Sequence, residues 1–310
     1  NDPTFSYYIK TLDSPSAGRE FNYVSAVSDG QYWQNSTYFG CIVGEYSNNN
    51  DTTISHRLFQ TRNWGETHNS VTINTTFDEF YLNADFLEGT SDSVVFITQR
   101  RFTTPGDEVR VMFTPWGTLS NSARTVFLTV DTLQYEKPII SIKQGPADTE
   151  KKILITCTKE GRARYHGSTN SGLTWDIDYT LDSRTNFSTN YTFVSSDSTG
   201  SSNDFCAMFS RRGTGDDSIN VRRGNLGSMG TTNYKLNAME ITSTHPAVTA
   251  IYRDGGTLNS TFAYWGNGPY GIYYDAEQLV SDVTDLPGTV DKYELAQNYP
   301  NPFNPSTTIR

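Results

Sequence analysis

The sequence has too few positive charges and too few long apolar runs for several classes of protein. Its 310 residues include 24 lysines and arginines against 34 aspartates and glutamates, a formal net charge of −10. This balance argues against a nucleic-acid-binding protein, which needs a basic surface, and against docking on an anionic membrane. The longest apolar runs, such as Val94–Ile97, are far shorter than the roughly 18 residues that span a bilayer. We therefore expect no membrane span.

Cysteine and histidine are also scarce. The three cysteines, Cys41, Cys157 and Cys206, cannot all pair with one another. They fall in separate repeat units, so we predict three buried, reduced thiols and no disulfide. No phosphate loop, dinucleotide fingerprint or Gly-x-Ser-x-Gly segment is present. The four histidines show no metal-ligand spacing, so we expect neither a metal nor a cofactor: His56, His68, His166 and His245.

Aromatic residues, by contrast, make up 13% of the chain, which argues against disorder. Strand-like apolar runs recur along it, and each ends in a polar, mostly charged pair. These pairs are Glu45-Tyr46, Arg100-Arg101, Lys159-Glu160, Arg211-Arg212 and Arg253-Asp254. Their first members lie 55, 59, 52 and 42 residues apart. The pattern therefore repeats about every 50 residues.

Each apolar run is flanked by further strand signals in a constant order. The strand-like segment 80–87 precedes the run 93–98, for example, and a strand ending at a glycine turn over 115–117 follows it. About four strands per unit at this period predict an all-β fold, a β-propeller of four-stranded blades. A pair of β-sandwiches is the alternative, but a sandwich has no reason to repeat this order.

The propeller is expected to cover residues 1–280, with five blades, or six as the alternative. The segment 7–12 precedes the first complete unit, so we expect it to pair into the last blade and close the ring. The fifth unit is expected to begin with a strand over 234–242, followed by the apolar run 247–252.

One turn has a more specific pattern. The segment from Ser168 to Trp175 reads Ser-Thr-Asn-Ser-Gly-Leu-Thr-Trp. Asn170 can bond backbone groups within such a turn, Gly172 can supply a positive φ, and the tryptophan can fill space between sheets. The segment resembles the Asp-box of sialidase-like propellers. The residues that match the pattern of that motif are Ser168, Asn170, Gly172, Thr174 and Trp175. In that family the Asp-box lies on the outer, lower side of a blade, so the resemblance implies architecture and not catalysis.

The C-terminal segment has a different composition. Residues 281–292 are polar, acidic and interrupted by Pro and Gly, as in a linker. Residues 293–310 then contain three prolines within six residues, which predicts an extended C-terminal arm. The core of this arm is Tyr299, Pro300, Asn301, Pro302, Phe303, Asn304 and Pro305.

This arm closely resembles the opening of the C-terminal sorting domain used by type IX secretion in Gram-negative bacteria. The resemblance implies the type IX machinery as a partner, export across the outer membrane, and release or attachment at the cell surface. Such a domain is a small β-sandwich, and the sequence ends about one strand into it.

The resemblance to sialidase-like propellers also implies what a catalytic site would need. In such enzymes an arginine triad grips a substrate carboxylate, and acidic side chains act at the glycosidic bond. The arginines at recurring blade positions are rim candidates for ligand binding: Arg100, Arg101, Arg211, Arg212 and Arg253. The alternative is that they are ordinary solvated strand ends.

No set of catalytic acids can be assigned. Asp85 and Glu240, in or beside first strands, could be two carboxylates of a furanosidase-type hydrolase, but no third stands out. We therefore expect a non-catalytic module that binds a surface glycan or surface protein, with a secreted glycoside hydrolase as the alternative. The catalytic residues of that alternative stay unknown.

Overall fold

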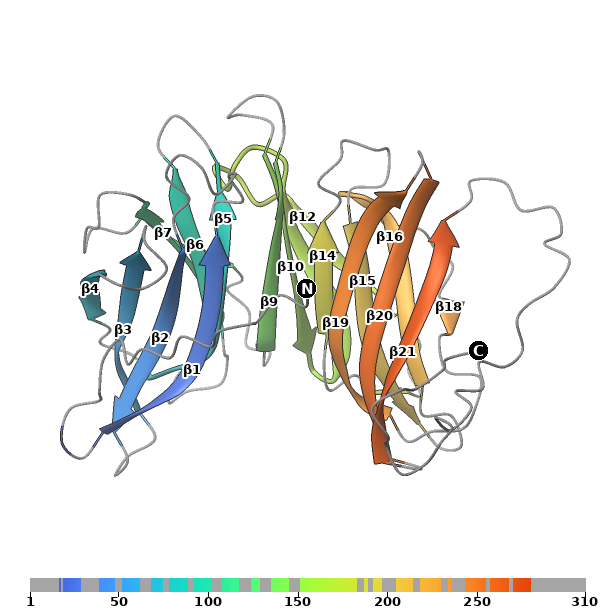
Figure 1. Ribbon diagram of the computed structural model, residues 1–310, viewed down its shortest axis with the longest axis horizontal. Coiled ribbons are helices and arrows are strands. Elements are labelled where there is room, and N and C mark those ends of the chain that lie inside the picture. Colours follow the sequence, from blue (N-terminus) through green and yellow to red (C-terminus); the bar gives the residue numbers. More distant parts are fainter. Residues whose placement is uncertain are drawn as a thin grey trace, which may run out of the picture. The chain divides into compact units, whose positions relative to one another are not determined.

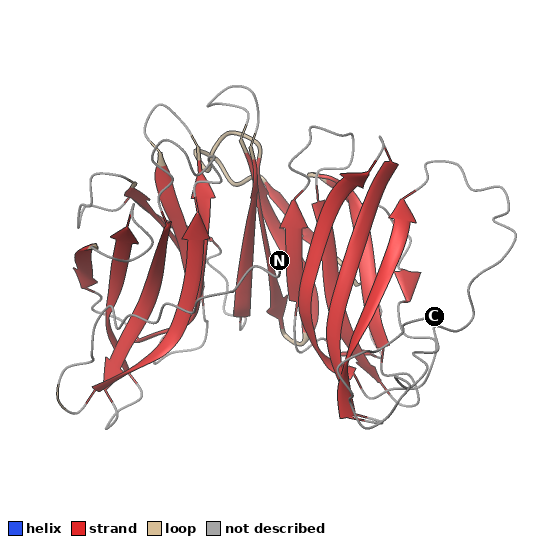
Figure 2. Cartoon of the chain, in the orientation of Figure 1, coloured by secondary structure: helices blue, strands red, loops and turns tan. Residues whose placement is uncertain are grey.

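The computed structural model describes residues 17, 19–28, 39–47, 52–61, 68–74, 78–88, 92–101, 108–116, 124–128, 135–144, 151–182, 187–188, 192–196, 205–213, 218–229, 234–235, 243–254, 257–267 and 270–279. Every regular element in these ranges is a β-strand (Figure 1, Figure 2), which confirms the predicted all-β class. Within them no helix is long and apolar enough to cross a membrane. The predicted closing strand at 7–12 and the arm after residue 280 lie outside the described residues.

The first three sheets are antiparallel meanders of four strands each, formed by consecutive strands of the chain. Sheet 1 contains β1 (Arg19–Ser28), β2 (Phe39–Ser47), β3 (Thr52–Thr61) and β4 (Asn69–Asn74). Sheet 2 contains β5 (Asp78–Leu87), β6 (Ser93–Arg101), β7 (Glu108–Pro115) and β8 (Arg124–Leu128). Sheet 3 contains β9 (Tyr135–Lys143), β10 (Lys152–Lys159), β11 (Arg162–Ser168) and β12 (Ile177–Thr180). The four strands predicted per unit are therefore confirmed for these three sheets.

Sheets 4 and 5 differ in their outer strands. Sheet 4 is built on β14 (Thr192–Ser196), β15 (Phe205–Gly213) and β16 (Ser218–Asn225), with the short strands β13 (Phe187–Ser188), β17 (Ser228–Met229) and β18 (Tyr234–Lys235) at its edges. Sheet 5 contains β19 (Ser243–Asp254), β20 (Thr257–Asn267) and β21 (Tyr270–Leu279). The chain forms two compact units, and the boundary between them lies after Gln278. All the described strands belong to the first unit, apart from Leu279, the last residue of β21.

The expectation for the fifth unit was wrong by one strand. The segment expected to open it contributes β18, which pairs with β16 at the outer side of sheet 4. The apolar run 247–252 belongs to β19, which contacts β14 and β15 and is therefore the first strand of sheet 5. First and second strands both carry apolar runs in this chain, as Ile139 and Ile140 show in β9, so composition did not separate the two.

Neighbouring sheets pack face to face through three apolar cores. Val94 and Phe96 of β6 lie in the core between sheets 1 and 2, whereas Val95 and Ile97 lie in the core between sheets 2 and 3. A third core joins sheets 3 and 4, and it includes Leu154 of β10 in sheet 3 together with apolar residues of sheet 4. The second strands β6, β10 and β15 are therefore buried on both faces, which explains why they read as continuous apolar runs instead of alternating ones.

Side chains of the first strands also bond the next sheet. The Asn83 Oδ1 atom accepts the N–H of Ile140 at 2.9 Å, and Asp85 Oδ2 accepts the N–H of Ile142 at 2.7 Å. In each of these bonds the two residues are 57 positions apart, so a step of two residues along β5 is matched by a step of two residues along β9. The first strands β5 and β9 therefore run parallel, one repeat apart.

The turns between third and fourth strands pack on the preceding sheet. Trp116, in this turn of sheet 2, packs so closely on β2 that a Cβ atom added to Gly40 would lie 2.6 Å from it. A Cβ atom added to Gly172, in the same turn of sheet 3, would lie 2.4 Å from Phe113 of sheet 2. These glycines leave space for the ring that enters from the neighbouring sheet. Four-stranded meanders whose faces are buried only against their neighbours are the blades of a β-propeller, and this chain has that fold.

Candidate functional site

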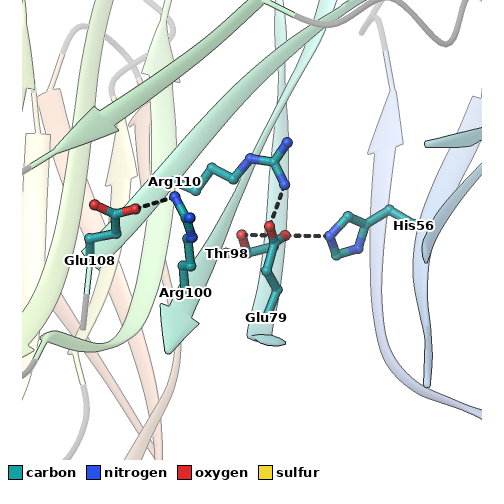
Figure 3. Close-up of polar contacts among 6 residues, drawn as sticks. All are labelled: His56, Glu79, Thr98, Arg100, Glu108 and Arg110. Carbon is teal, nitrogen blue, oxygen red and sulfur yellow. Dashed lines mark hydrogen bonds and ion pairs between the residues drawn. The ribbon is translucent and has the colours of Figure 1, made fainter. Parts of the chain in front are cut away.

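A buried ionic network joins sheets 1 and 2, and Figure 3 shows its six residues. Glu79 of β5 is at its centre, with a side chain that is 0% exposed. The Nε2 atom of His56, on β3 of the preceding sheet, lies 2.6 Å from Glu79 Oε2, and the Thr98 hydroxyl donates to the same oxygen at 3.0 Å. Arg110 of β7 donates from Nη1 to the other oxygen, Oε1. One carboxylate therefore ties together three strands of its own sheet and one of the preceding sheet.

This network holds Glu79 as an anion. Burial alone would raise the pKa of Glu79, but the hydrogen bonds and charges of His56 and Arg110 outweigh it and lower that pKa to about 2. A carboxyl group with such a pKa is ionised at neutral pH and has no proton to donate. Glu79 can therefore serve as a structural or positioning anion, but not as a general acid near neutral pH.

A second pair continues the network along sheet 2. Arg100 of β6 donates from Nη1 to Oε1 of Glu108 on β7 at 2.7 Å, and both side chains are largely buried, at 10% and 14% exposure. Partial burial raises the pKa of Glu108, although the neighbouring Arg100 acts in the opposite direction. Arg100, a rim candidate from the sequence, thus forms an internal ion pair.

Arg211, a rim candidate on sheet 4, has an equivalent partner. Its Nε atom donates to Asp182 Oδ2 at 2.7 Å, and the two side chains are 4% and 6% exposed. The side chains of Arg101, Arg212 and Arg253 lie outside the described residues. The described rim candidates are therefore Arg100 and Arg211, and each of them has an internal acidic partner.

The backbone of Arg253 also occupies a different place in its sheet. Arg253 pairs with Leu258 beside the turn that joins β19 to β20, the first and second strands of sheet 5. Arg100 and Arg211 instead lie near the ends of second strands. Successive turns of a meander alternate between the two ends of a sheet, so Arg253 is not at the end that corresponds to the other two.

The first-strand acids named from the sequence have separate outcomes. Asp85 is half-buried, and its carboxylate accepts the N–H groups of Phe86 at 2.8 Å and of Ile142 at 2.7 Å. Burial raises the pKa of Asp85 to about 6, although these two hydrogen bonds act in the opposite direction. Glu240 lies outside the described residues.

The turn from Ser168 to Trp175 is held by its own side chains. Asn170 Oδ1 accepts the N–H of Thr174 at 2.9 Å, and Ser168 Oγ accepts the N–H of Gly172 at 2.9 Å. Gly172 has a φ of +75°, and Trp175 packs against the core between sheets 2 and 3. These contacts hold the turn together and pack it against the neighbouring core.

Arg124 of sheet 2 fixes this turn to the preceding blade. Its guanidinium donates to the carbonyl oxygens of Gly172 at 2.7 Å and Ser171 at 3.3 Å. The same group lies 3.7 Å from the centre of the Phe113 ring, within the range of a cation–π contact. The turn therefore joins neighbouring blades.

Cysteine and metal chemistry is limited among the described residues. Cys157 and Cys206 are free and buried, as predicted, and the side chain of Cys41 is not among those described. Burial raises the pKa of the Cys157 thiol to about 12, so it is not a reactive thiolate. The described His, Cys, Asp and Glu side chains form no group of three or more that could hold a metal ion.

Sequence reasoning missed the Glu79 network. His56 and Glu79 lie 23 residues apart on different sheets, and no motif links them. The available signal was a charged residue at the start of the first strand β5, directly before the run Phe80-Tyr81-Leu82. Such a residue predicts a buried partner, but the sequence does not say which one.

Comparison with known proteins supports the fold. No protein-family model matches this chain, and no curated protein does. A protein of unknown function from Dyadobacter fermentans has a TM-score of 0.50 at 12% identity, over 86% of this chain and 80% of that chain.

Two sialidase structures are also similar. The K499G mutant of NanB sialidase from Streptococcus pneumoniae has a TM-score of 0.47 at 12% identity, over 80% of this chain and 53% of that chain. Trypanosoma rangeli sialidase in complex with the inhibitor DANA has a TM-score of 0.49 at 9% identity, over 86% and 46%. The chain spans about half the length of these two sialidases.

Proposed function

We propose that this chain is an exported β-propeller that acts at the surface of a Gram-negative bacterium as a non-catalytic module. Its partner there is a glycan or another surface protein. The observation that supports this reading is the internal pairing of the charged side chains that a sialidase-type enzyme would leave available to its substrate.

The arginines provide the clearest case. A substrate carboxylate is gripped by guanidinium groups that have no internal acid already bound. Arg100 is paired with Glu108, and Arg211 is paired with Asp182, each at 2.7 Å in largely buried surroundings. Breaking either pair would leave a buried, uncompensated charge, which is strongly unfavourable. We infer that these arginines stabilise blades and do not bind substrate.

The proposed destination comes from the C-terminal arm. The Asn-Tyr-Pro-Asn-Pro-Phe-Asn-Pro run from Asn298 to Pro305 resembles a type IX sorting signal. A propeller with 13% aromatic residues and a net charge of −10 suits a module that stays dispersed in water and binds a partner through polar and aromatic groups. We propose residues 1–280 as the working module, 281–292 as a linker and 293–310 as the start of the sorting domain.

One observation favours a second candidate, a secreted glycoside hydrolase. The pKa of Asp85, about 6, is in the range of carboxylic acids that donate a proton to a leaving group. Its carboxylate is already bonded to two backbone N–H groups, however, and a hydrolase needs a second carboxylate about 5–9.5 Å away. The non-catalytic role is therefore our preferred function.

The two candidates are separated by one set of assays on the purified full chain. Chromogenic glycosides of sialic acid, arabinofuranose, xylose and glucose are incubated with wild type, Asp85→Asn and Asp176→Asn between pH 4 and 8. Asp176 is an exposed residue outside the network and serves as the matched control. We expect no turnover in any variant, together with binding of the wild type to a surface glycan or surface protein. Turnover that Asp85→Asn removes and Asp176→Asn keeps would establish the hydrolase instead.

A further inference from the structure

Three successive first strands carry a β-bulge at the same position of the repeat. In β1 the extra residue is Asn22, between the paired residues Phe21 and Tyr23. In β5 the pair Tyr81-Leu82 lies opposite the single residue Thr98, and in β9 the pair 137–138 lies opposite Cys157. Bulges redirect the side chains beside them and are common next to binding sites.

Two of these bulges hold a large residue in the left-handed region. Tyr81 has a φ of +52° and Lys137 has a φ of +55°. This region is unfavourable for residues with a Cβ atom, and more so for Lys137, because Pro138 follows it. The two positions are 56 residues apart, so the strained backbone recurs with the repeat. Strain of this kind persists where the surroundings enforce it and is concentrated at functional sites.

The surroundings of Tyr81 enforce its conformation. Thr98, opposite the bulge, donates to Glu79, and Glu79 is fixed in turn by His56 and Arg110. The Lys137 bulge is joined to the same sheet, since its backbone N–H donates to Gln99 Oε1 at 3.4 Å. The buried network thus supports the Tyr81 bulge through Thr98, which gives Glu79 a positioning role, and Gln99 links the Lys137 bulge to sheet 2.

The bulges bring aromatic rings together. The ring of Tyr81 lies 5.6 Å from that of Tyr23, on the first strand of the preceding sheet, at an interplanar angle of 46°. Tyr23, Tyr81 and Lys137 are all half-buried, so part of each side chain reaches solvent. The tilted Tyr23–Tyr81 pair is partly exposed, and Lys137 occupies the equivalent bulge of β9, the first strand of sheet 3, which contacts β5. Two rings and a lysine on neighbouring first strands offer apolar surface and polar groups to a ligand.

We propose that Tyr23, Tyr81 and Lys137 form a binding site for an uncharged glycan of hexopyranose units. Tyrosine rings are rigid, amphipathic surfaces that suit the C–H faces of pyranose rings, and their hydroxyls and the Lys137 ammonium can bond sugar hydroxyls. An acidic glycan fits less well, because the chain carries −10 and Arg100 and Arg110 are neutralised internally. This inference rests on the proposed non-catalytic function and names the ligand class and the site.

The test is calorimetric titration of the full chain with four hexasaccharides: cellohexaose, chitohexaose, maltohexaose and hexagalacturonate. We expect at least one neutral hexasaccharide to bind at least tenfold more tightly than hexagalacturonate, with little change between 0.05 and 0.5 M salt. Tyr23→Ala and Tyr81→Ala should each weaken that binding at least tenfold, and Lys137→Met several-fold. Tyr179→Ala, at a tyrosine of β12 that is 51% exposed and also contacts another ring, is the matched control and should leave affinity unchanged.

A further variant separates binding from folding. Tyr81→Gly suits the left-handed backbone, so its melting temperature should be at least that of Tyr81→Ala, whereas its affinity should be equally low. Tight binding of hexagalacturonate would overturn the ligand class, and unchanged affinity in Tyr23→Ala and Tyr81→Ala would overturn the site. A wild type that binds a surface protein but no hexasaccharide overturns this inference alone. A wild type that binds neither overturns the proposed function as well.

Discussion

The carboxylate of Asp85 accepts a hydrogen bond from the backbone N–H of Ile142, a residue one repeat further along the chain, at 2.7 Å. Asn83 bonds Ile140 in the same way at 2.9 Å. Side-chain oxygens of Asn83 and Asp85 in β5 thus accept backbone N–H groups of β9, in the way that carbonyl oxygens do between parallel strands. Here, however, the two strands belong to separate sheets. This arrangement fixes the register of neighbouring blades and places an acid where water is scarce.

The first prediction follows from the pKa of Asp85. It rises from 3.8 to about 6 on folding, so the folded protein binds more protons than the unfolded chain between these values. The contribution of Asp85 to the free energy of unfolding is therefore greatest below about pH 4 and is lost as the pH rises through 6. The loss is at most about 3 kcal/mol. Urea unfolding at intervals between pH 4 and 7 measures it.

Asp85→Asn keeps an acceptor oxygen for Ile142 and removes the titration. Its free energy of unfolding should therefore change less between pH 4 and 7 than that of wild type. Asp176→Asn, at an exposed position, should follow the wild-type curve. An Asp85→Asn curve that declines as steeply as wild type would contradict this interpretation.

The second prediction concerns the centre of the ionic network. Glu79→Gln leaves Arg110 and His56 without the carboxylate that compensates them in buried surroundings. We expect the free energy of unfolding at pH 7 to fall by about 3–5 kcal/mol. Because the pKa of Glu79 is lowered from 4.5 to about 2, wild type should lose this stabilisation as the pH falls through that range.

Two further variants test whether the effect belongs to the buried charge. Asp178→Asn breaks an ion pair with Arg164 in which the two side chains are 45% and 22% exposed, and it should cost less than about 1 kcal/mol. Combining Glu79→Gln with Arg110→Met should cost less than the sum of the two single changes, because the uncompensated cation is removed. Strict additivity would show that the two residues act independently.

The repeat was predictable because the second strands whose side chains are described, β6, β10 and β15, are buried on both faces. Val94 to Ile97 alternate between two cores, so the strand reads as a continuous apolar run, and that run recurs at a regular spacing. The same property misplaced the fifth unit, since the first strand β19 carries a comparable run. The assignment of β18 to sheet 4 depends on its pairing with β16, and strand pairing leaves no local signal in the sequence.

The contacts of the site were beyond sequence reasoning for a related reason. The rim arginines Arg100 and Arg211 were visible as members of Arg-Arg pairs, but their acidic partners were not. Asp182 is 29 residues from Arg211 and follows the last strand of another sheet, so only the packing of sheets 3 and 4 reveals the pair. The left-handed φ of Tyr81 has no sequence signature either, because tyrosine rarely adopts it.

The third prediction concerns the turn between β11 and β12. Gly172→Ala would force a Cβ into a left-handed backbone and within 2.4 Å of the Phe113 ring. Gly227, in the turn between β16 and β17, has a similar φ of +87°, but a Cβ there would meet only an ordinary contact at 3.7 Å. Gly227→Ala should cost about 1 kcal/mol for backbone strain alone, and Gly172→Ala about 2–4 kcal/mol. Equal losses in urea unfolding would mean that Phe113 moves away without cost.

The fourth prediction concerns the thiols. Cys157 and Cys206 are free and buried, and the thiol pKa of Cys157 is raised to about 12. Neither should react with a thiol reagent in the native protein, whereas the denatured, unreduced protein should expose three reactive thiols. A count of one after denaturation would reveal a disulfide that includes Cys41.

The last prediction concerns the C-terminal arm. Pro300, Pro302 and Pro305 lack the N–H donors that a central strand needs, so we expect the arm to add nothing to the propeller sheets. A chain ended after Val280 should keep the melting temperature of the full chain within a few degrees. In a host with type IX secretion, the same shortened chain should accumulate inside the cell while the full chain reaches the surface. A large fall in melting temperature with delivery unaffected would instead make the arm part of the fold. The two measurements therefore separate a sorting signal from a structural segment.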